Sequence, residues 1–409
     1  MQDFQKTLDG EGGGRLMKIG INALFRWKPT GVANYICNLV YHLSRIDLKN
    51  DYVVFTTPEN RSYFPIEQEN FKLVYCSLNS ENPIRRRLWE QLFLPKLIRS
   101  HDIDLLHCPM NVLPLFSKGI NVVTLIDTQY FQNPEHFSFL RRNYLKIMMK
   151  ASLKRANGII TISEAVKREI EECFRGNKKE IRVIHFGLDP CFKVIKHTDR
   201  IEEIKRRYGI RGKYLLFAGY PHYRKNLPRL IKAFRKVVDL LNESYTLVIA
   251  GEMGTDDSDI RNIELTIQQE GMREKVLFAG YIPGICIRGE EEPSMTLLMN
   301  GAELLVYPSL YEGFGLPALE GMACATPVLA SDIPVHREVA GKAAIYVNPY
   351  EIEDIAQGIY RGLTDDSLRN GIVSEGIERV KLFRWEKNAQ KTLEYYEELF
   401  DQARRRKNG

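Results

Sequence analysis

The sequence predicts an α/β protein whose two doubly wound, parallel-sheet domains face each other across a cleft. At 409 residues the chain is too long for one ordinary hydrophobic core, so two domains are the default. Strand-like and helix-like segments alternate along almost the whole chain, which favours parallel strands joined by right-handed crossovers. A polar stretch without a strand, residues 186–212, interrupts this alternation once. Since open α/β sheets bind ligands at the carboxyl ends of their strands, we expect the ligand in the cleft.

The first series of segments follows a glycine-rich flexible leader, residues 1–16, and predicts an N-terminal domain over residues 17–190. Short apolar runs predict its strands at 18–22, 52–56, 71–76, 104–107, 121–125, 158–162 and 181–184. Helical spacing of apolar residues predicts helices at 31–44, 86–99, 137–155 and 163–173.

The second series follows a linker with one helix, residues 191–212, and predicts a C-terminal domain over residues 213–383. Its strands are expected near 214–218, 245–250, 275–279, 303–307, 327–330 and 344–347. The stretch 384–409 is helical in pattern, and we expect it to pack back on the N-terminal domain. Its apolar face comprises Ala389, Leu393, Tyr396, Leu399 and Phe400.

Composition excludes several classes of protein. No apolar run approaches the roughly 20 residues that a membrane-spanning helix needs, and the first residues lack the apolar core of a secretory signal. Seven scattered cysteines, none in a C-x-x-C pair, predict free thiols in a reducing cytoplasm. A net charge of +6 permits an anionic ligand or membrane surface but does not call for nucleic acid.

Familiar cofactor motifs are missing from the sequence. There is no G-x-G-x-x-G and no G-x-x-x-x-G-K-[ST], which argues against a nicotinamide dehydrogenase and a P-loop protein. The eight histidines show no metal-ligand spacing. The two D-x-D strings, Asp102–Asp104 and Asp257–Asp259, are expected to be structural, so we predict no metal site.

Two strand-to-helix loops are candidates for binding phosphate. In RWKPTGVANY (26–35), Gly31 opens a helix, whose free N–H groups suit an anion, although a plain turn glycine would look the same. In GYPHYRKNLPRL (219–230), Arg224 and Lys225 stand at the mouth of a helix that Asn226 can cap. Two cations there suit a diphosphate, and the alternative is a solvated basic turn.

A third loop, PSLYEGFGLPALEGMACATPV (308–328), combines glycines with two acids. Gly313 and Gly315 let backbone amides face a ligand, while Glu312 lies in the loop and Glu320 one turn into the next helix. Carboxylates repel phosphate, so their expected partners are neutral hydroxyls. The combination predicts a ligand with both sugar and phosphate; the alternative is a helix-start acid and a solvated loop acid.

Together these segments resemble the retaining glycosyltransferases of family 4, which have the GT-B fold. The likeness runs from Met17 to about Leu399, and its most specific piece is the Glu-x7-Glu region, PSLYEGFGLPALEGMACATPVLASDIPVHREV. Weaker pieces are PTGVANYICNL, ITISEAVKREI, IRVIHFGLDP, YRKNLPRLIKAF and WEKNAQKTLEYY. The resemblance implies hexose transfer from a nucleotide diphosphate sugar with retained anomeric configuration, without metal or other cofactor, and an acceptor-binding N-terminal domain.

The resemblance also implies roles for individual residues. Arg224 and Lys225 would bind the donor diphosphate and stabilise the leaving nucleotide, with the Gly31 backbone on its other side. Glu312 would contact hydroxyls of the donor sugar, and Glu320 would hold the ribose. The implied donor-binding set is Gly31, Arg224, Lys225, Glu312, Gly313, Phe314, Gly315, Leu316 and Glu320.

Two departures from the family pattern affect what can be carried over. Many relatives have His-Asp beside the acceptor, where this chain has Ile126-Asp127. Asp127 is expected either to orient or deprotonate the acceptor hydroxyl or to serve as a capping or structural residue. Residues 282–293 form an insertion that would border the nucleotide base, which leaves the base preference open.

The acceptor is expected to be a glycan or a lipid-linked glycan. In 140–155, Arg142, Lys146, Lys150 and Lys154 recur every four residues on one helical face, and Arg85–Arg87 would extend the basic patch. Such a helix predicts either peripheral binding to an anionic membrane or a solvated face.

The stretch DTQYFQNPEHFS resembles members that transfer mannose, which favours GDP-mannose over a UDP-sugar. The predicted function is therefore hexose transfer in cell-surface polysaccharide biosynthesis. The alternatives are a nucleotide-sugar epimerase and a catalytically silent GT-B protein that binds nucleotide-sugar or glycan.

Overall fold

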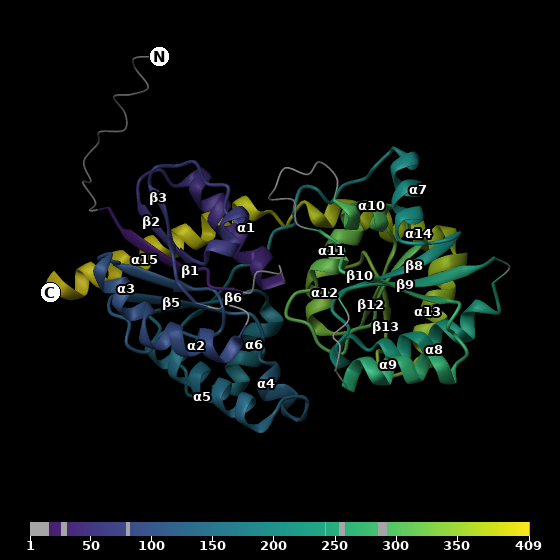
Figure 1. Cartoon of the computed structure of the whole chain (residues 1–409), viewed down its shortest axis with the longest axis horizontal. Coiled ribbons are helices and arrows are strands. Elements are labelled where there is room, and N and C mark those ends of the chain that lie inside the picture. Colours follow the sequence, from purple (N-terminus) through teal and green to yellow (C-terminus); the bar gives the residue numbers. More distant parts are fainter. Residues whose placement is uncertain are drawn as a thin grey trace, which may run out of the picture.

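The computed structural model describes residues 16–25, 31–78, 82–241, 243–252, 258–284 and 293–408. Within this part of the chain, two parallel sheets lie side by side, each covered by helices (Figure 1). The strand orders are β3-β2-β1-β4-β5-β6-β7 and β10-β9-β8-β11-β12-β13. Both orders reverse direction beside the first strand of the domain, which is the hallmark of a doubly wound sheet. The predicted fold class is confirmed.

The N-terminal sheet consists of short strands buried between two layers of helices. Its strands are β1 (Lys18–Asn22), β2 (Asp51–Thr56), β3 (Phe71–Tyr75), β4 (Leu105–Cys108), β5 (Ile120–Leu125), β6 (Gly158–Thr161) and β7 (Ile181–Val183). The α-helices are α1 (Gly31–Ile46), α2 (Pro83–Leu92), α3 (Leu94–Ser100), α4 (Gln129–Gln132), α5 (Phe139–Arg155) and α6 (Glu164–Cys173), with 3₁₀ turns η1 (Pro58–Tyr63) and η2 (Pro134–His136). Every residue of β5 is buried, as expected for a central parallel strand.

One predicted helix of this domain is wrong. The segment 86–99 forms two helices, α2 and α3, because the chain turns at Phe93. Pro95 lies in the first turn of α3, where its missing N–H costs nothing, whereas inside one continuous helix it would break the hydrogen-bond ladder.

The C-terminal sheet consists of β8 (Lys213–Ala218), β9 (Tyr245–Ala250), β10 (Val276–Gly280), β11 (Leu304–Tyr307), β12 (Val328–Ser331) and β13 (Ile345–Val347). Its helical elements are α7 (Thr198–Arg207), η3 (Tyr223–Lys225), α8 (Leu227–Val238), α9 (Ser258–Gln269), α10 (Ser294–Gly301), α11 (Leu316–Ala323), α12 (Pro334–Ala340), α13 (Ile352–Thr364) and α14 (Asp366–Val380). Helix α7, which lies in the stretch predicted as a linker, packs on α10 of this domain.

The last helix, α15 (Trp385–Asn408), runs back across the molecule and packs on α1 of the N-terminal domain (Figure 1). A buried polar chain fixes it there: the Tyr396 hydroxyl lies 2.6 Å from Nδ1 of His107, whose Nε2 lies 2.7 Å from Oγ1 of Thr124. The Tyr35 hydroxyl also reaches Thr124, at 3.1 Å. Burial lowers the pKa of His107 to about 3, so this histidine is neutral and links α15 to the sheet without a buried charge.

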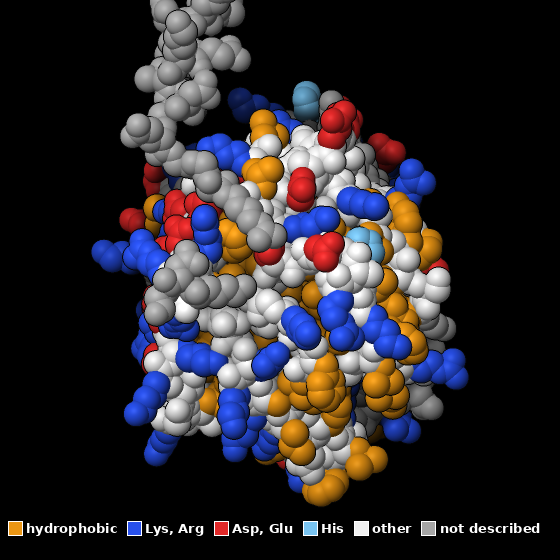
Figure 2. Space-filling view, turned by 90° about the vertical axis from the view of Figure 1, so that its left-hand side faces the viewer, with side chains coloured by type: hydrophobic (Ala, Val, Ile, Leu, Met, Phe, Trp, Pro, Cys, Tyr) orange, Lys and Arg blue, Asp and Glu red, His pale blue; other side chains and the backbone are white. Residues whose placement is uncertain are grey.

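The end of the molecule formed by the N-terminal domain is rich in basic side chains. Figure 2 shows Lys and Arg side chains across this end with exposed hydrophobic side chains beside them. On α2 and α5 the large hydrophobic residues exposed to solvent are Ile84, Leu88, Leu92, Phe139, Leu140 and Ile147, which we call the exposed apolar residues of α2 and α5. No helix in the described ranges is long and apolar enough to cross a bilayer.

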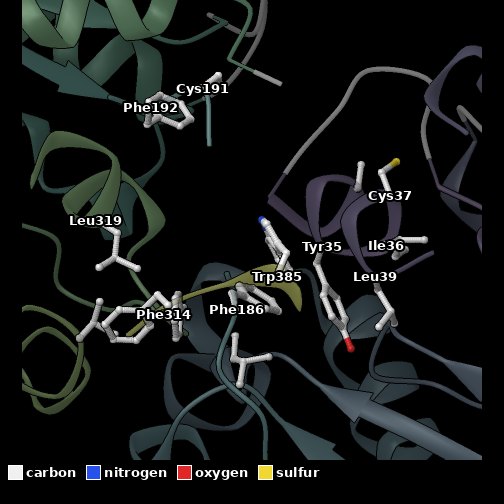
Figure 3. Close-up of a cluster of buried hydrophobic side chains, with 14 of the residues drawn as sticks. Tyr35, Ile36, Cys37, Leu39, Phe186, Cys191, Phe192, Phe314, Leu319 and Trp385 are labelled. Atoms are coloured by element: carbon white, nitrogen blue, oxygen red, sulfur yellow. The ribbon is translucent and has the colours of Figure 1, made fainter. Parts of the chain in front are cut away.

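Two chain segments pass beside each other where the domains meet. The N–H of Leu188 donates to the carbonyl of Phe383 at 3.1 Å, and a Cβ on Gly187 would lie 2.2 Å from the Trp385 nitrogen, so only glycine fits. Figure 3 shows the ring of Phe186 between Phe314 of the C-terminal domain and Trp385 at the start of α15. The buried hydrophobic cluster is therefore continuous from one domain to the other.

The cysteines differ in part from expectation. Cys37, Cys76, Cys108, Cys173 and Cys324 are free, but Cys191 takes part in a disulfide. The prediction of free thiols throughout the chain is wrong at this position, because sequence spacing cannot reveal which thiols the fold brings together.

Candidate active site

Arg224, Lys225 and Glu312 form one buried ion cluster at the carboxyl edge of the C-terminal sheet. Arg224 Nη1 lies 2.7 Å from Oε2 of Glu312, and Lys225 Nζ lies 2.5 Å from Oε1. Lys225 also donates to the Tyr307 hydroxyl at 2.5 Å, and Arg224 donates to the Tyr311 carbonyl at 3.2 Å. Two of the three predicted loops therefore join in one site.

The charges in this cluster stabilise one another. Burial opposes ionisation of Glu312, but Arg224 and Lys225 outweigh it and hold the pKa of Glu312 well below its ordinary value. Burial lowers the pKa of Lys225 to about 8 despite the neighbouring carboxylate. Near neutral pH the cluster holds two cations and one anion, so its net charge still favours an anionic ligand.

Asn226 positions the two cations, although not as predicted. It precedes α8 with φ of 61°, in the left-handed region, and its side chain does not cap the helix. Instead Nδ2 donates to the carbonyls of Pro308 at 3.0 Å and Pro349 at 2.6 Å. The backbone also joins the loops, because the N–H of Leu310 donates to the Arg224 carbonyl at 2.7 Å. Asn226 thus fastens the Arg–Lys loop to the loop that carries Glu312.

The loop before α11 brings backbone groups to the site. Gly315 precedes the helix with φ of 98°, a conformation that favours glycine, and leaves the first N–H groups of α11 without partners inside the helix. Leu316 begins the helix and is partly buried. The side chain of Phe314 points away into the interdomain cluster, where its ring centre lies 5.2 Å from that of Phe186.

Gly313 lies against the N-terminal domain. A Cβ at this position would approach the Ile126 carbonyl oxygen to 2.3 Å, and the Gly313 carbonyl accepts a hydrogen bond from Ser163 at 3.0 Å. This glycine is therefore needed for the contact between the domains, whether or not its amide also faces a ligand.

Glu320 lies one turn into α11 and is mostly buried. Burial, reinforced by Asp189 and opposed by Lys225, raises the pKa of Glu320 to about 8. At neutral pH this carboxyl group therefore stays mostly protonated, which is unusual for a glutamate. Groups with such strongly shifted pKa values cluster at functional sites.

Asp127 belongs to the N-terminal domain and follows β5. Gln129 donates to its Oδ2 at 3.0 Å, while its buried Oδ1 has no hydrogen-bond partner among the described residues. Burial raises the pKa of Asp127, and the charge of Arg224 opposes that rise. The structure thus brings Asp127 into electrostatic contact with the ion cluster.

A polar bridge between the domains was missed from the sequence. Tyr311 accepts a hydrogen bond from the N–H of Thr128 at 3.0 Å and donates to Glu169 at 2.9 Å. The Thr128 hydroxyl donates to the same Glu169 oxygen. These residues are far apart in the chain and share no sequence pattern. The only signal in the sequence was that Tyr311 directly precedes Glu312, which suggested that Tyr311 lies near the site.

His336 is a second residue that sequence reasoning missed. It is buried beneath Gly315, where a Cβ would lie 3.2 Å from its ring, and Nδ1 lies 3.1 Å from the Ser331 carbonyl. No described residue provides a partner for its Nε2. Burial lowers the pKa of His336 to about 4, so a neutral imidazole lies below the start of α11.

The remaining predicted residues lie at the margin of the site. Gly31 opens α1 and is exposed, and no described atom lies within 4 Å of the point where a Cβ would stand, but residues 26–30 of its loop lie outside the described ranges. Most of the insertion at 282–293 lies outside them as well. Asp104 and Asp259 accept backbone hydrogen bonds, from Lys18 and Tyr223. The described residues contain no cluster of His, Cys, Asp and Glu that could hold a metal ion.

Comparisons with known proteins point to one family. A family model described as glycosyl transferases group 1 matches residues 200–379, and one described as Glycosyltransferase Family 4 matches residues 29–191. The O-antigen chain mannosyltransferase B of Escherichia coli is 29% identical over 318 residues, covering 77% of this chain and 78% of that protein. The O-antigen chain mannosyltransferase RfbU of Salmonella typhimurium is 30% identical over 260 residues, covering 63% and 64%.

Solved structures share the fold. The sucrose-phosphate synthase of Thermosynechococcus elongatus superposes with a TM-score of 0.75 at 20% identity, covering 94% of this chain and 99% of that one. Anabaena Alr3699/HepE, solved in complex with UDP and glucose, superposes with a TM-score of 0.70 at 17% identity, covering 93% and 100%. The two family models together span most of the chain, one on each domain. The chain belongs to the GT-B glycosyltransferases of the group 1 and family 4 type.

Proposed function

We propose that this glycosyltransferase moves mannose from GDP-mannose to a glycan or lipid-linked glycan acceptor, with retention of configuration, in the assembly of a cell-surface polysaccharide. The observation that carries the proposal is the buried Arg224–Lys225–Glu312 cluster beside the start of α11, with Asp127 opposite. The relatives named as O-antigen mannosyltransferases support mannose and polysaccharide assembly.

The chemistry follows from these charges. The donor diphosphate would lie on Arg224, Lys225 and the free N–H groups of α11, which stabilise the negative charge that develops on the leaving nucleotide. This positive field would take the place of a metal ion. Glu312 would accept hydrogen bonds from hydroxyls of the donor sugar and Glu320 from the ribose. Asp127 Oδ1, which has no hydrogen-bond partner among the described residues, would accept a hydrogen bond from the acceptor hydroxyl.

A thermal-shift screen with GDP-mannose, GDP, UDP-glucose and ADP-glucose tests the donor, because a ligand that binds the native state raises its melting temperature. We expect GDP and GDP-mannose to give the largest shifts. Release of GDP and the anomeric configuration of the product, followed by NMR, then separate a transferase from a silent binding protein or an epimerase. Absence of a shift with every nucleotide would contradict the proposal.

We also propose that the protein works in the cytoplasm at an anionic membrane surface. Lys150 and Lys154 are exposed on α5 beside the exposed apolar residues of α2 and α5, which together form an amphipathic surface. Arg142 and Lys146 are less available, because they lie over the rings of Phe139 and Phe131.

Flotation with phosphatidylglycerol-containing vesicles tests this surface. Reversing the charge at Lys150 and Lys154 should release the protein from the vesicles, whereas reversing it at Lys342 and Arg361, exposed in the C-terminal domain, should not. Equal binding by the two variants would refute the membrane proposal.

A further inference from the structure

A group of arginines on α2 and α5 has no role in the donor site. Arg86 and Arg87 are neighbours on α2, and Arg87 reaches Tyr144 of α5, while Arg141 comes from the start of α5. Arg87 lies over the ring of Tyr144 at 5.8 Å, and Arg141 lies over the rings of Tyr130 at 5.9 Å and Phe137 at 5.5 Å. Three guanidinium groups are thus gathered in one region, two of them held on aromatic faces.

The group is poorly neutralised. Its nearest acid is Glu90, whose Oε1 lies 3.7 Å from Nε of Arg86, too far for a hydrogen bond. Arg87 makes no ion pair with any described residue. Burial and the like charges of Arg141 and Arg86 lower the pKa of Arg87, so this cation is unfavourably placed unless an anion joins it.

Several buried polar atoms of the same group lack hydrogen-bond partners. Within the described ranges, Nε of Arg86, Oε1 of Glu90 and the hydroxyl of Tyr144 make no hydrogen bond. Buried polar groups are rarely left unpaired, and each such atom costs about 1–3 kcal/mol of stability. Arg86 Nε and Glu90 Oε1 face each other as an ion pair, so the atom without any partner is the Tyr144 hydroxyl, beside the unpaired Arg87. A buried donor next to an unpaired cation favours an anionic ligand.

The location of the group relates it to the reaction. Tyr130, which Arg141 overlies, lies three residues after Asp127 and interacts electrostatically with it. The donor diphosphate has its own cations on the opposite domain, at Arg224 and Lys225. An anion beside Asp127 would therefore belong to the acceptor. On the outer face of α2, Ile84, Leu88 and Leu92 are exposed at intervals of four residues, where an apolar chain attached to that anion can lie.

We propose that Arg86, Arg87 and Arg141, with the Tyr144 hydroxyl, form a binding site for a phosphate group of the acceptor. The acceptor class is then a glycan carried on a lipid phosphate or diphosphate. Guanidinium groups suit this ligand because their N–H pairs match phosphate oxygens two at a time. This inference rests on the proposed transferase function and narrows its acceptor.

Binding of farnesyl diphosphate to the full-length protein saturated with GDP tests the site, since GDP occupies the donor cations. Isothermal titration should show binding of farnesyl diphosphate and weaker binding of inorganic pyrophosphate, but no binding of farnesol. Arg87→Gln and Arg141→Gln should each weaken farnesyl diphosphate binding about tenfold or more, the worth of one charge-assisted contact. Arg85→Gln is the matched control, because Arg85 is exposed on the same helix.

Several results would overturn the site. These are no diphosphate binding in the presence of GDP, or equal losses in Arg85→Gln, Arg87→Gln and Arg141→Gln. If Arg87→Gln lowers binding to phosphatidylglycerol vesicles but leaves farnesyl diphosphate binding unchanged, the ligand is a membrane headgroup and the acceptor assignment is wrong. An unchanged GDP-induced thermal shift in each variant shows that it is folded.

The same titrations separate this inference from the proposed function. If GDP fails to bind at all, the donor proposal fails. The anion site then stands only if Arg87→Gln loses diphosphate affinity and Lys225→Met keeps it; the reverse pattern refutes it.

Discussion

The two edges of the cleft are built in opposite ways. On the C-terminal side, the two oxygens of Glu312 are paired with the buried Lys225 and the partly buried Arg224, and Lys225 has a further partner in Tyr307. On the N-terminal side, Asp127 and Tyr144 each keep a buried polar atom that makes no hydrogen bond with a described residue. The charges of the C-terminal ion cluster pair with one another in the free protein, although Nε2 of the nearby His336 has no hydrogen-bond partner among the described residues. On the N-terminal side, polar groups that face the proposed acceptor are left over.

This difference matches the separate roles that the donor site and the acceptor site have in the proposed reaction. A donor site that stabilises a leaving group must have its charges in place beforehand, because reorganising them would add to the barrier. An acceptor site can instead obtain its missing hydrogen bonds from the substrate. The following predictions test the contrast, from the largest expected effect to the smallest.

Glu312→Gln tests the completeness of the donor edge. The change removes the only anion paired with Arg224 and Lys225 in the described structure, and breaking a buried pair costs about 3–5 kcal/mol. Urea denaturation should show this loss, and turnover should fall more than affinity for free GDP. Glu312→Gln/Lys225→Met should regain part of the stability without regaining activity. If Glu312→Gln is as stable as the wild type, the ion pairs of Glu312 with Arg224 and Lys225 do not stabilise the fold.

Glu320→Gln tests the buried acid on the same edge through pH. The folded-state pKa of about 8 lies above the ordinary value of 4.5, so over this interval the unfolded chain has lost the proton that the native state keeps. Stability from this group therefore falls as pH rises between those values. The glutamine variant should gain about 1–3 kcal/mol on the wild type at pH 8 and little at pH 5.

Glu320→Gln should also bind nucleotide more weakly, because it lacks the carboxyl group that would accept hydrogen bonds from the ribose. Urea melts at both pH values together with GDP titrations measure the two effects. A gain that does not depend on pH would mean that Glu320 is not the group responsible.

Tyr311→Phe tests the bridge between the two edges. Removing the hydroxyl takes a hydrogen-bond acceptor from Thr128 and a donor from Glu169, at a cost of about 1–2 kcal/mol. Since the contact joins the domains, KM for the sugar donor should rise as well. Tyr396→Phe is the matched control: it removes a buried hydroxyl outside the cleft, so it should lower stability and leave KM unchanged. Identical kinetic effects in both variants would exclude a specific role for the bridge.

Asp127→Asn should have the smallest effect on stability. Burial raises the pKa of Asp127 above its ordinary value, so its ionised form destabilises the fold at neutral pH, and asparagine should change the unfolding free energy by no more than about 1 kcal/mol, in the stabilising direction. Turnover should nevertheless fall. Full activity in this variant, measured as GDP release with acceptor present, would remove Asp127 from the chemistry.

The sequence allowed most of the fold to be predicted, because alternation of apolar runs and helical spacing is a local signal. The break between α2 and α3 was missed even though Pro95 is visible in the sequence. The acids and cations of the donor loops were predicted by type, but their pairing was not, since Glu312 and Lys225 are 87 residues apart.

The site features that could not be predicted depend on packing between the domains. Glu169 meets Tyr311 from 142 residues away, and the imidazole of His336 is significant only because Gly315 lies above it. Such contacts depend on how the two folded domains pack against each other, and this packing cannot be predicted from any short segment of the sequence.

The path of α15 has a consequence for the order of folding during synthesis. The buried hydrogen-bond chain from Tyr35 through Thr124 and His107 ends on Tyr396, so the N-terminal domain lacks a part of its own core until α15 has been made. The surface that Tyr396 and Leu399 cover stays exposed until the second domain has been made. Completion of the N-terminal domain therefore has to wait for synthesis of α15, and until then the face of α1 that α15 covers stays open to solvent.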